Sequence, residues 1–315
     1  MNEKTKAYLA ALSFSAIIGF SFLFTKIALG YASPLTNLAH RYTIAALVMV
    51  VLHQTKLIKV SLSRKDIFSI LPIKVSLSRK DIFSILPMSL FYPLFFFIFQ
   101  SFALQYISSS EAGILQALVP IFTLLLASAF LKEKTSLLQK FFLFLSVAGV
   151  VFIFLSKGAN FGTETASFGF LLMLGSVLAN AINNILSKSK GGRYRAMDMT
   201  AVVIFVGFVT FNTLSLTSHY LDSNILAYVA PLGQLPYLLS ILYLGILASI
   251  VTGSLSIYAI VRLGASTVSV FGNLGTVLTI VAGALILHEP IYSYHMIGAT
   301  LIIAGILGMN LMRKK

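Results

Sequence analysis

Three asparagines within one apolar stretch are the residues whose spacing most clearly predicts a binding site. Asn180, Asn183 and Asn184 stand at i, i+3 and i+4, so their amides share one face of a helix. Amides that face lipid are costly, so this stripe is expected to face protein or water. The spacing leaves two interpretations open: the wall of a cavity that binds a small molecule, or a ladder of hydrogen bonds to a neighbouring helix.

Four other neutral polar residues lie within long apolar runs and are further candidates for contact with a substrate. Asn273 stands between two glycines, which allow a ligand or another helix to approach the backbone closely. A proline follows Gln116 by four residues and frees a backbone carbonyl one turn earlier. Tyr92 and Gln100 lie two turns apart in a third run. Close helix packing, a proline kink and hydrogen bonds between helices are the structural alternatives for these residues.

Three charged residues lie within or beside the apolar runs. Lys26 and Arg41 stand toward the same end of the first two runs, and we interpret them as long side chains that reach for the membrane interface. Attraction of a carboxylate or phosphate group is the functional alternative. Glu111 lies on the same side and is expected to pair with one of these cations; alternatively, it takes up the proton in a proton-coupled cycle.

The sequence carries no pattern that is typical of an enzyme or of a metal site. It has no Cys, and His288 and His295 stand too isolated to predict a metal centre. A phosphate-binding loop and a nucleophile elbow are also missing from the sequence. We therefore predict no catalytic residue, no metal and no cofactor.

Apolar helices are expected to hold all these residues in place. Of the 315 residues, 58% are hydrophobic and only 10% are charged, whereas roughly a quarter of the residues in soluble domains are charged. About 20 apolar residues in a helix cross the hydrocarbon core of a bilayer. The sequence thus predicts an all-α integral membrane protein with about ten transmembrane helices, near residues 7–30, 35–53, 83–105, 110–131, 137–156, 168–187, 199–217, 236–260, 265–287 and 294–312.

The distribution of basic residues predicts how these helices are oriented. Most of the 23 Lys and Arg residues fall in alternate gaps between the runs, and the opposite gaps hold only Lys157. The positive-inside rule then predicts a multi-pass protein of the cell membrane with both termini in the cytoplasm. Because the basic residues occupy short gaps rather than one face of a soluble domain, no binding of nucleic acid is predicted despite the net charge of +14.

Two repeats of different age organise the chain. Residues 58–72 recur without change as residues 73–87, in a gap that is predicted to be cytoplasmic. Identity this complete indicates a recent slip duplication or an error in the sequence rather than a functional module. A second, diverged repeat at an offset of 156 residues matches Glu133 with Glu289 and Gly149 with Gly305. It predicts two five-helix domains, 7–157 and 166–312. Because five is odd, the second domain is expected to cross the membrane in the opposite sense to the first, and the matched glutamates are expected to cap the helices that follow them.

Short motifs follow one another in a recognisable order over both halves of the chain. They are Lys26, Ser33-Pro34, Arg41, Ala103–Gly113, Val119-Pro120, Leu131–Glu133, Ala148-Gly149, Leu287–Pro290 and Gly298–Gly305. Their order and spacing resemble the EamA family of the drug/metabolite transporter superfamily, from about residue 7 to residue 312. This resemblance implies a ten-helix fold, a central cavity and the export of amino acids or similar metabolites. Members of that family often have a proline in the ninth helix where the fourth has Pro120, whereas this chain has Gly272–Thr276 there.

An inverted repeat with polar residues near the membrane midplane favours a secondary transporter. Such repeats give a protein two similar conformations that open a central site to either side in turn. We therefore predict a protein that exports a small-molecule metabolite by alternating access, with the lipid bilayer and its substrate as partners. The alternative is a non-transporting membrane receptor or assembly subunit. The sequence assigns neither the substrate, the direction of transport, the coupling ion nor the oligomeric state.

Overall fold

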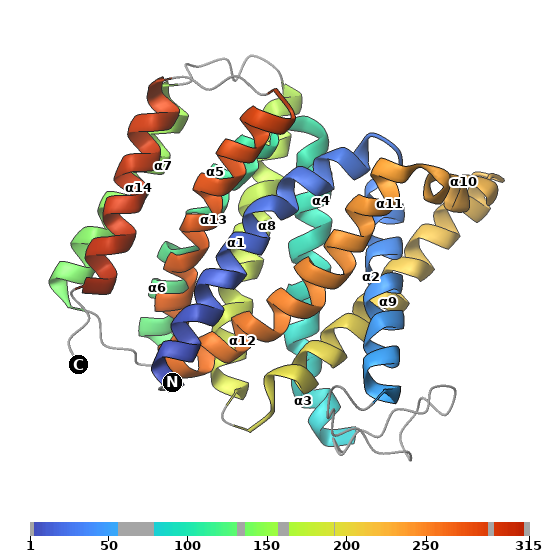
Figure 1. The fold of residues 1–315 in the computed structure, drawn as a ribbon, viewed down its shortest axis with the longest axis horizontal. Coiled ribbons are helices and arrows are strands. Elements are labelled where there is room, and N and C mark those ends of the chain that lie inside the picture. Colours follow the sequence, from blue (N-terminus) through green and yellow to red (C-terminus); the bar gives the residue numbers. More distant parts are fainter. Residues whose placement is uncertain are drawn as a thin grey trace.

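A computed structural model of the chain describes residues 3–55, 79–130, 136–156, 164–191, 193–288 and 293–311, and this part of the chain is helical without strands (Figure 1). The helices of the first half are α1 (Glu3–Leu29), α2 (Pro34–Gln54), α3 (Arg79–Ser89), η1 (Leu90–Phe95), α4 (Phe96–Tyr106), α5 (Ser109–Gln116), α6 (Val119–Phe130) and α7 (Leu137–Ser156). Those of the second half are α8 (Glu164–Lys190), α9 (Ala196–Leu221), α10 (Leu226–Val229), η2 (Ala230–Gly233), α11 (Leu235–Leu242), η3 (Tyr243–Val251), α12 (Thr252–Leu263), α13 (Ala265–Ile286) and α14 (Ser293–Leu311).

Eight helical stretches of the described residues are long and apolar enough to cross a membrane. Four of these stretches are single helices, namely α1, α2, α9 and α13, and a fifth is most of α8. The other three each run through adjoining elements, namely α3–η1–α4, α5–α6 and α11–η3–α12. The remaining two predicted runs coincide with α7 and α14, whose apolar stretches are shorter in the described residues, Leu137–Gly149 and Met296–Gly305. The all-helical membrane protein is therefore confirmed, whereas the count of ten transmembrane helices stays a prediction.

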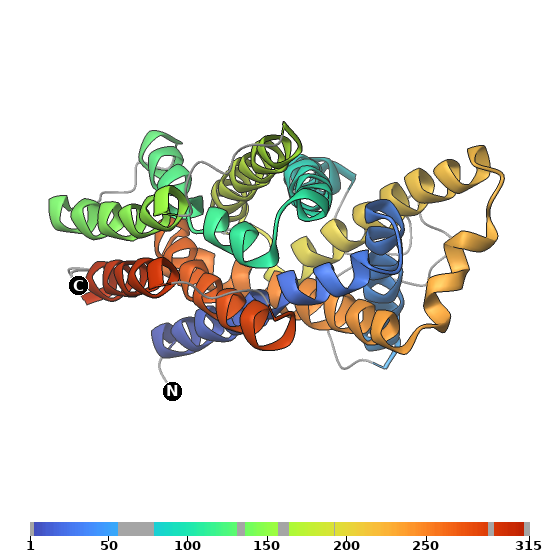
Figure 2. The same ribbon diagram turned by 90° about the horizontal axis from the view of Figure 1, so that it is seen from above.

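The helices associate in groups that do not follow the order of the chain. In one group, α1 packs against α12 and α13; in another, α8 packs against α4 and α6. We call these the α1 group and the α8 group. The two groups meet where α13 contacts α5 and α6, and α2 packs against α9 beside them. The pair α7 and α14 lies at one edge of the molecule in both views (Figures 1 and 2).

Local sequence signals explain where several of these helices begin. The hydroxyl of Ser33 accepts a hydrogen bond from the backbone N–H of Thr36, and Pro34 occupies the first helical position of α2. Ser108 and Glu111 form a reciprocal capping box at the start of α5. Gly264 separates α12 from α13 with a φ of 93°, a conformation that favours glycine.

Three of the predicted spans are interrupted near their middle: the fourth span of the first half, between Gln116 and Val119, and the third span of each half. In the first half, η1 contains Tyr92 in an extended conformation (φ −136°, ψ 109°), followed by Pro93. In the second half, η3 is a π-helical segment of nine residues. Segments with π-helical turns occur frequently at functional sites.

The two repeats are only partly visible in the described residues. Glu133 and Glu289, and residues 58–78 of the recent duplication, lie outside them. The end of its second copy forms the start of α3, at Arg79 rather than near residue 83. There Asp81 accepts hydrogen bonds from Arg193 Nη2 (2.8 Å) and Tyr194 Oη (3.0 Å). The duplicated sequence therefore anchors the third span to the segment that follows α8.

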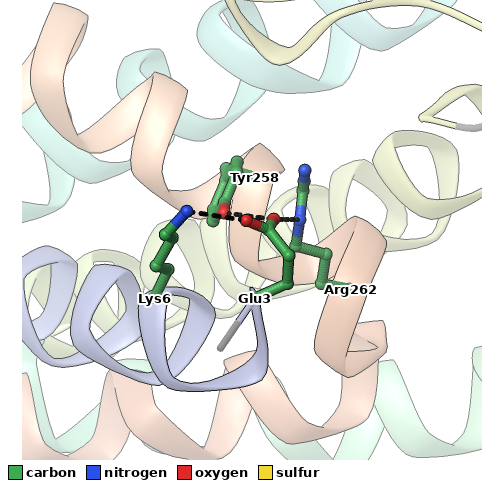
Figure 3. A network of polar contacts seen from close by, with 4 residues as sticks. All are labelled: Glu3, Lys6, Tyr258 and Arg262. Atoms are coloured by element: carbon green, nitrogen blue, oxygen red, sulfur yellow. Dashed lines mark hydrogen bonds and ion pairs between the residues drawn. The ribbon is translucent and has the colours of Figure 1, made fainter. Parts of the chain in front are cut away.

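A polar cluster joins the first turn of α1 to the last turns of α12 (Figure 3). Glu3 Oε2 accepts hydrogen bonds from Tyr258 Oη (3.1 Å) and Arg262 Nε (3.3 Å), and Lys6 Nζ donates to Glu3 Oε1 (2.8 Å). The guanidinium of Arg262 also lies over the ring of Tyr258, 3.7 Å from its centre. Exposed ion pairs contribute little to stability. We therefore expect the cluster to help align α1 with α12 and to add little to the stability of the α1 group.

Candidate functional site

A cavity lies between the α1 group and the α8 group, and about 990 Å³ of space within and around it, open solvent included, is free of protein atoms. All eight candidate spans contribute residues to its lining, whereas α7 and α14 contribute none. Both halves of the chain therefore form its wall. A cavity between helices that combines apolar side chains with a few polar groups is typical of a site for a small molecule.

One wall of this cavity is made of amides. Asn180, Asn183 and Asn184 all face it from α8, together with Gln116 from the end of α5. Asn180 Nδ2 donates to Gln116 Oε1 (3.4 Å), and Asn184 Nδ2 donates to Thr123 Oγ1 on α6 (3.3 Å). The stripe thus combines the two interpretations that the sequence left open, since its amides line a cavity and two of them also bond to neighbouring helices.

Asn183 differs from its two neighbours. Its side chain is buried, with 7% exposed, and its Oδ1 has no hydrogen-bond partner among the described residues. A buried carbonyl oxygen without a partner costs about 1–3 kcal/mol. Within the cavity lining, Asn183 is therefore the amide that is ready to accept a hydrogen bond from a ligand.

Aromatic side chains form another part of the lining. Phe14 and Phe22 reach it from α1, Tyr42 from α2, Tyr92 from η1 and Phe96 from α4. The ring of Tyr92 lies 5.2 Å from that of Phe96, centre to centre. Rings in such contact present both faces and edges to a ligand. The lining therefore offers a ligand both hydrogen-bonding groups and apolar rings.

Two residues that the sequence suggested as substrate contacts do not belong to the cavity lining. Gln100 is buried within the bundle, with 4% exposed, and lies outside the lining. Asn273 points to α7, where its Nδ2 donates to Ser146 Oγ (2.8 Å). Both glycines beside Asn273, Gly272 and Gly275, line the cavity. Gly275 also packs closely against α1. The structural alternative, close packing of helices, describes Asn273 better than ligand binding does.

Arg41 is buried inside the helix bundle, which is at odds with the expectation that its side chain extends to the membrane interface. The side chain is 2% exposed, and its guanidinium lies 3.9 Å from the ring centre of Phe97. Its Nε donates to Ser249 Oγ (2.9 Å) and its Nη2 to the carbonyl of Ala248 (2.9 Å). Arg41 therefore binds η3 from behind the cavity wall, because Ser249 itself is part of the lining.

The other two charged candidates satisfy backbone groups at helix ends. Lys26 Nζ donates to the carbonyls of Leu104 (2.6 Å) and Ile107 (2.9 Å) at the end of α4. Glu111 accepts from the backbone N–H of Ser108 (2.7 Å) as part of the capping box of α5. Both contacts connect segments at the end of the bundle where α1 ends. Neither residue belongs to the cavity lining, so the lining contains no charged side chain among the described residues.

Several lining residues had no signal in the sequence. Hydroxyl groups reach the cavity from four helical elements, and single Ser and Thr residues are so common in membrane helices that their spacing predicts little. These lining residues are Thr200, Ser249, Thr252, Ser256, Ser269 and Thr276. The described residues also contain no cluster of three His, Cys, Asp or Glu that could hold a metal ion.

Comparison with known proteins relates the whole chain to membrane carriers. A model of the EamA-like transporter family matches residues 5–155 and 167–311. The uncharacterized transporter YcxC of Bacillus subtilis (strain 168) is 41% identical over 315 residues, which cover 100% of this chain and 96% of that protein. The uncharacterized transporter YvbV of the same organism is 27% identical over 311 residues, covering 98% and 92% respectively.

One solved crystal structure of a protein has a similar fold. It superimposes with a TM-score of 0.63 over 98% of this chain and 97% of that chain, at 20% sequence identity. At this identity the similarity concerns the fold alone.

Proposed function

This chain belongs to the EamA-like transporter family and is a multi-pass membrane transporter, and from this premise we propose that it moves a small amphipathic metabolite across the cell membrane by alternating access. The observation that carries the proposal is the cavity between the two halves, with an amide wall that includes the unpartnered oxygen of Asn183. Export is the direction that we propose, following the resemblance of its motifs.

The pattern of helix contacts supports two related conformations. If the five helices of the first half are exchanged with those of the second, the contact of α1 with α13 becomes that of α8 with α6, and the contact of α1 with α12 becomes that of α8 with α4. The pairs α2 with α9 and α7 with α14 exchange into themselves. Such exchange symmetry is expected of two five-helix units in opposite orientation, which open a central site to either side in turn.

The chemistry of the lining supports a substrate without net charge. A charged ligand would need a counter-charge or water to replace its hydration, and the described lining residues offer amides, hydroxyls and aromatic rings instead. A neutral or zwitterionic molecule that has both hydrogen-bonding groups and an apolar part fits this mixed lining. Amino acids and related compounds belong to this class.

Flux measurement in proteoliposomes tests the proposal directly. We expect the purified protein to accelerate the movement of at least one neutral or zwitterionic metabolite with an apolar group, compared with vesicles that lack it. The panel should include strongly anionic metabolites, which are expected to move more slowly. Specific binding without any flux across the panel would favour a receptor or assembly subunit and would contradict the transport proposal.

The opposite orientation of the two halves predicts the positions of accessible tags. A tag inserted after residue 160 is expected to face the cell exterior, because five helices precede it, and a tag at the C-terminus is expected to face the cytoplasm. Accessibility to an impermeant reagent in intact and permeabilised cells measures both. Two tags on the same side of the membrane would rule out five-helix units in opposite orientation.

A further inference from the structure

Lys26 and Lys188 make equivalent contacts in the two halves of the molecule. Each lies in the last turn of the first membrane helix of its half. Each side chain donates to backbone carbonyl groups at the end of the third membrane helix of the same half. Lys26 Nζ donates to Leu104 and Ile107 at the end of α4, at 2.6 and 2.9 Å. Lys188 Nζ donates to the carbonyl of Val261 in the last turn of α12, at 2.7 Å. A lysine that binds free carbonyls at a helix C-terminus is favoured both by hydrogen bonding and by the helix dipole.

The two contacts lie at opposite ends of the bundle. In Figure 1, α1 ends at the upper side of the bundle and α8 ends at the lower side. Lys26 and Lys188 belong to the last turns of these two helices. Each lysine stands four residues beyond a cavity residue on the same helix, Lys26 after Phe22 and Lys188 after Asn184. Residues four apart share one helix face and are separated by about one turn. The contacts therefore lie just beyond the two ends of the cavity.

Each contact also joins the two groups of helices. Lys26 connects α1 of the α1 group with α4 of the α8 group, and Lys188 connects α8 of the α8 group with α12 of the α1 group. Separation of the groups at one end must break the contact at that end and can leave the other intact. Lys190, also on α8, differs in this respect, because its Nζ donates to Ser84 Oγ (2.8 Å) in the span that continues into α4.

The geometry points to Lys26 and Lys188 as two latches that hold the opposite ends of the cavity closed and release in alternation during transport. This inference rests on the proposed alternating access and adds the residues that control it. A hydrogen bond from a charged donor contributes enough to shift a two-state equilibrium on the order of tenfold. Because the two latches are equivalent in chemistry, they oppose each other and keep both conformations accessible.

Thiol labelling of a single cysteine measures this equilibrium without a substrate. The chain has no native Cys, and Ser256 faces the cavity, so Ser256→Cys provides a reporter. Its labelling by an impermeant reagent is compared in right-side-out and inside-out vesicles. In this background, Lys26→Met is expected to increase labelling from the side where α1 ends, relative to the other side, by about tenfold. Lys188→Met is expected to shift the ratio by a similar factor in the opposite direction.

Further variants separate latches from general structural roles. The double variant Lys26→Met with Lys188→Met is expected to return the ratio to within about twofold of the parent, because only the difference between the latches sets the equilibrium. Lys26→Arg and Lys188→Arg keep a charged donor and are expected to retain most of the parent ratio, and Lys190→Met serves as the matched control. If a methionine variant is not inserted in the membrane, Lys→Gln at the same position is expected to shift the ratio in the same direction by a smaller factor.

Shifts of both single variants in the same direction, or no shift in either, would overturn the latches. A shift from Lys190→Met as large as that from Lys188→Met would overturn them as well. The result is distinguishable from a failure of the transport proposal. If the protein carries flux but the lysine variants do not change the labelling ratio, the latch inference is wrong and the transport proposal stands. If the variants shift the ratio in opposite directions but the protein carries no flux, the latch inference stands and the transport proposal is wrong.

Discussion

Replacement of Asn183 by alanine is expected to weaken the apparent affinity for the transported substrate by about 5- to 150-fold, which corresponds to about 1–3 kcal/mol. The buried Oδ1 of Asn183 has no partner among the described residues, so the free protein already bears the cost of leaving it unpaired. Substrate binding recovers that cost, and the alanine variant cannot. The concentration dependence of initial flux in proteoliposomes measures the effect.

Asn184 provides a matched control, for which the larger effect is expected on the melting temperature rather than on the affinity. Asn184 Nδ2 donates to Thr123 on α6 (3.3 Å), so Asn184→Ala is expected to lower the melting temperature more than it changes the affinity. Asn183→Ala removes an unsatisfied buried oxygen and is expected to leave the melting temperature unchanged or to raise it. Equal affinity losses in both variants, or a large loss of stability in Asn183→Ala, would contradict the role assigned to Asn183.

Substitution of Gly305 by alanine is expected to destabilise the protein by about 1–3 kcal/mol, as overpacking at a close helix contact does. A Cβ at Gly305 on α14 would lie 2.6 Å from the carbonyl oxygen of Phe142 and 2.7 Å from the backbone nitrogen of Ser146, both on α7. These are backbone atoms, which cannot move aside without separating the helices. Small residues permit such close approach in membrane proteins. Thermal unfolding in detergent measures the change.

Two other glycines make this prediction specific. Gly149 on α7 has the reciprocal environment, with the carbonyl oxygen of Gly298 at 2.7 Å from its would-be Cβ, so Gly149→Ala is expected to cost as much. A Cβ at Gly272 would meet no atom within 4 Å, and Gly272→Ala is expected to leave the stability within about 0.5 kcal/mol of the parent. A protein with Gly305→Ala that unfolds at the parent temperature would show that the two helices do not pack this closely.

Hydropathy predicted the helices of this protein well because the length of an apolar run can be read directly from the sequence, without knowledge of tertiary contacts. Each of the ten predicted runs coincides with helical structure in the described residues. Hydropathy did not reveal the interruptions at η1 and η3, since both segments consist mainly of apolar residues and their backbone geometry depends on neighbouring helices. A proline such as Pro93 indicates a local weakness in a helix, but similar prolines elsewhere leave helices intact.

The candidate site could be predicted only where several residues shared a face. The stripe at Asn180, Asn183 and Asn184 identified a cavity wall because its spacing fixes a direction on one helix. Single residues carry no such information, and Asn273 and Gln100, which the sequence suggested as substrate contacts, lie outside the cavity lining. The equivalence of Lys26 and Lys188 could be suspected from the repeat, but their carbonyl partners lie on helices that the sequence does not place.

The duplicated stretch also bears on how such a chain tolerates change in length. The copy next to the third span supplies Asp81 and Ser84, which are held by Arg193, Tyr194 and Lys190. A copying slip that inserts 15 residues upstream of these docking points preserves both the docking residues and their distance from the membrane helix. Since the copies are identical, the first turns of α3 contain the same residues with or without the inserted copy. A change of 15 residues in the length of this loop therefore leaves the contacts that anchor the third span unchanged.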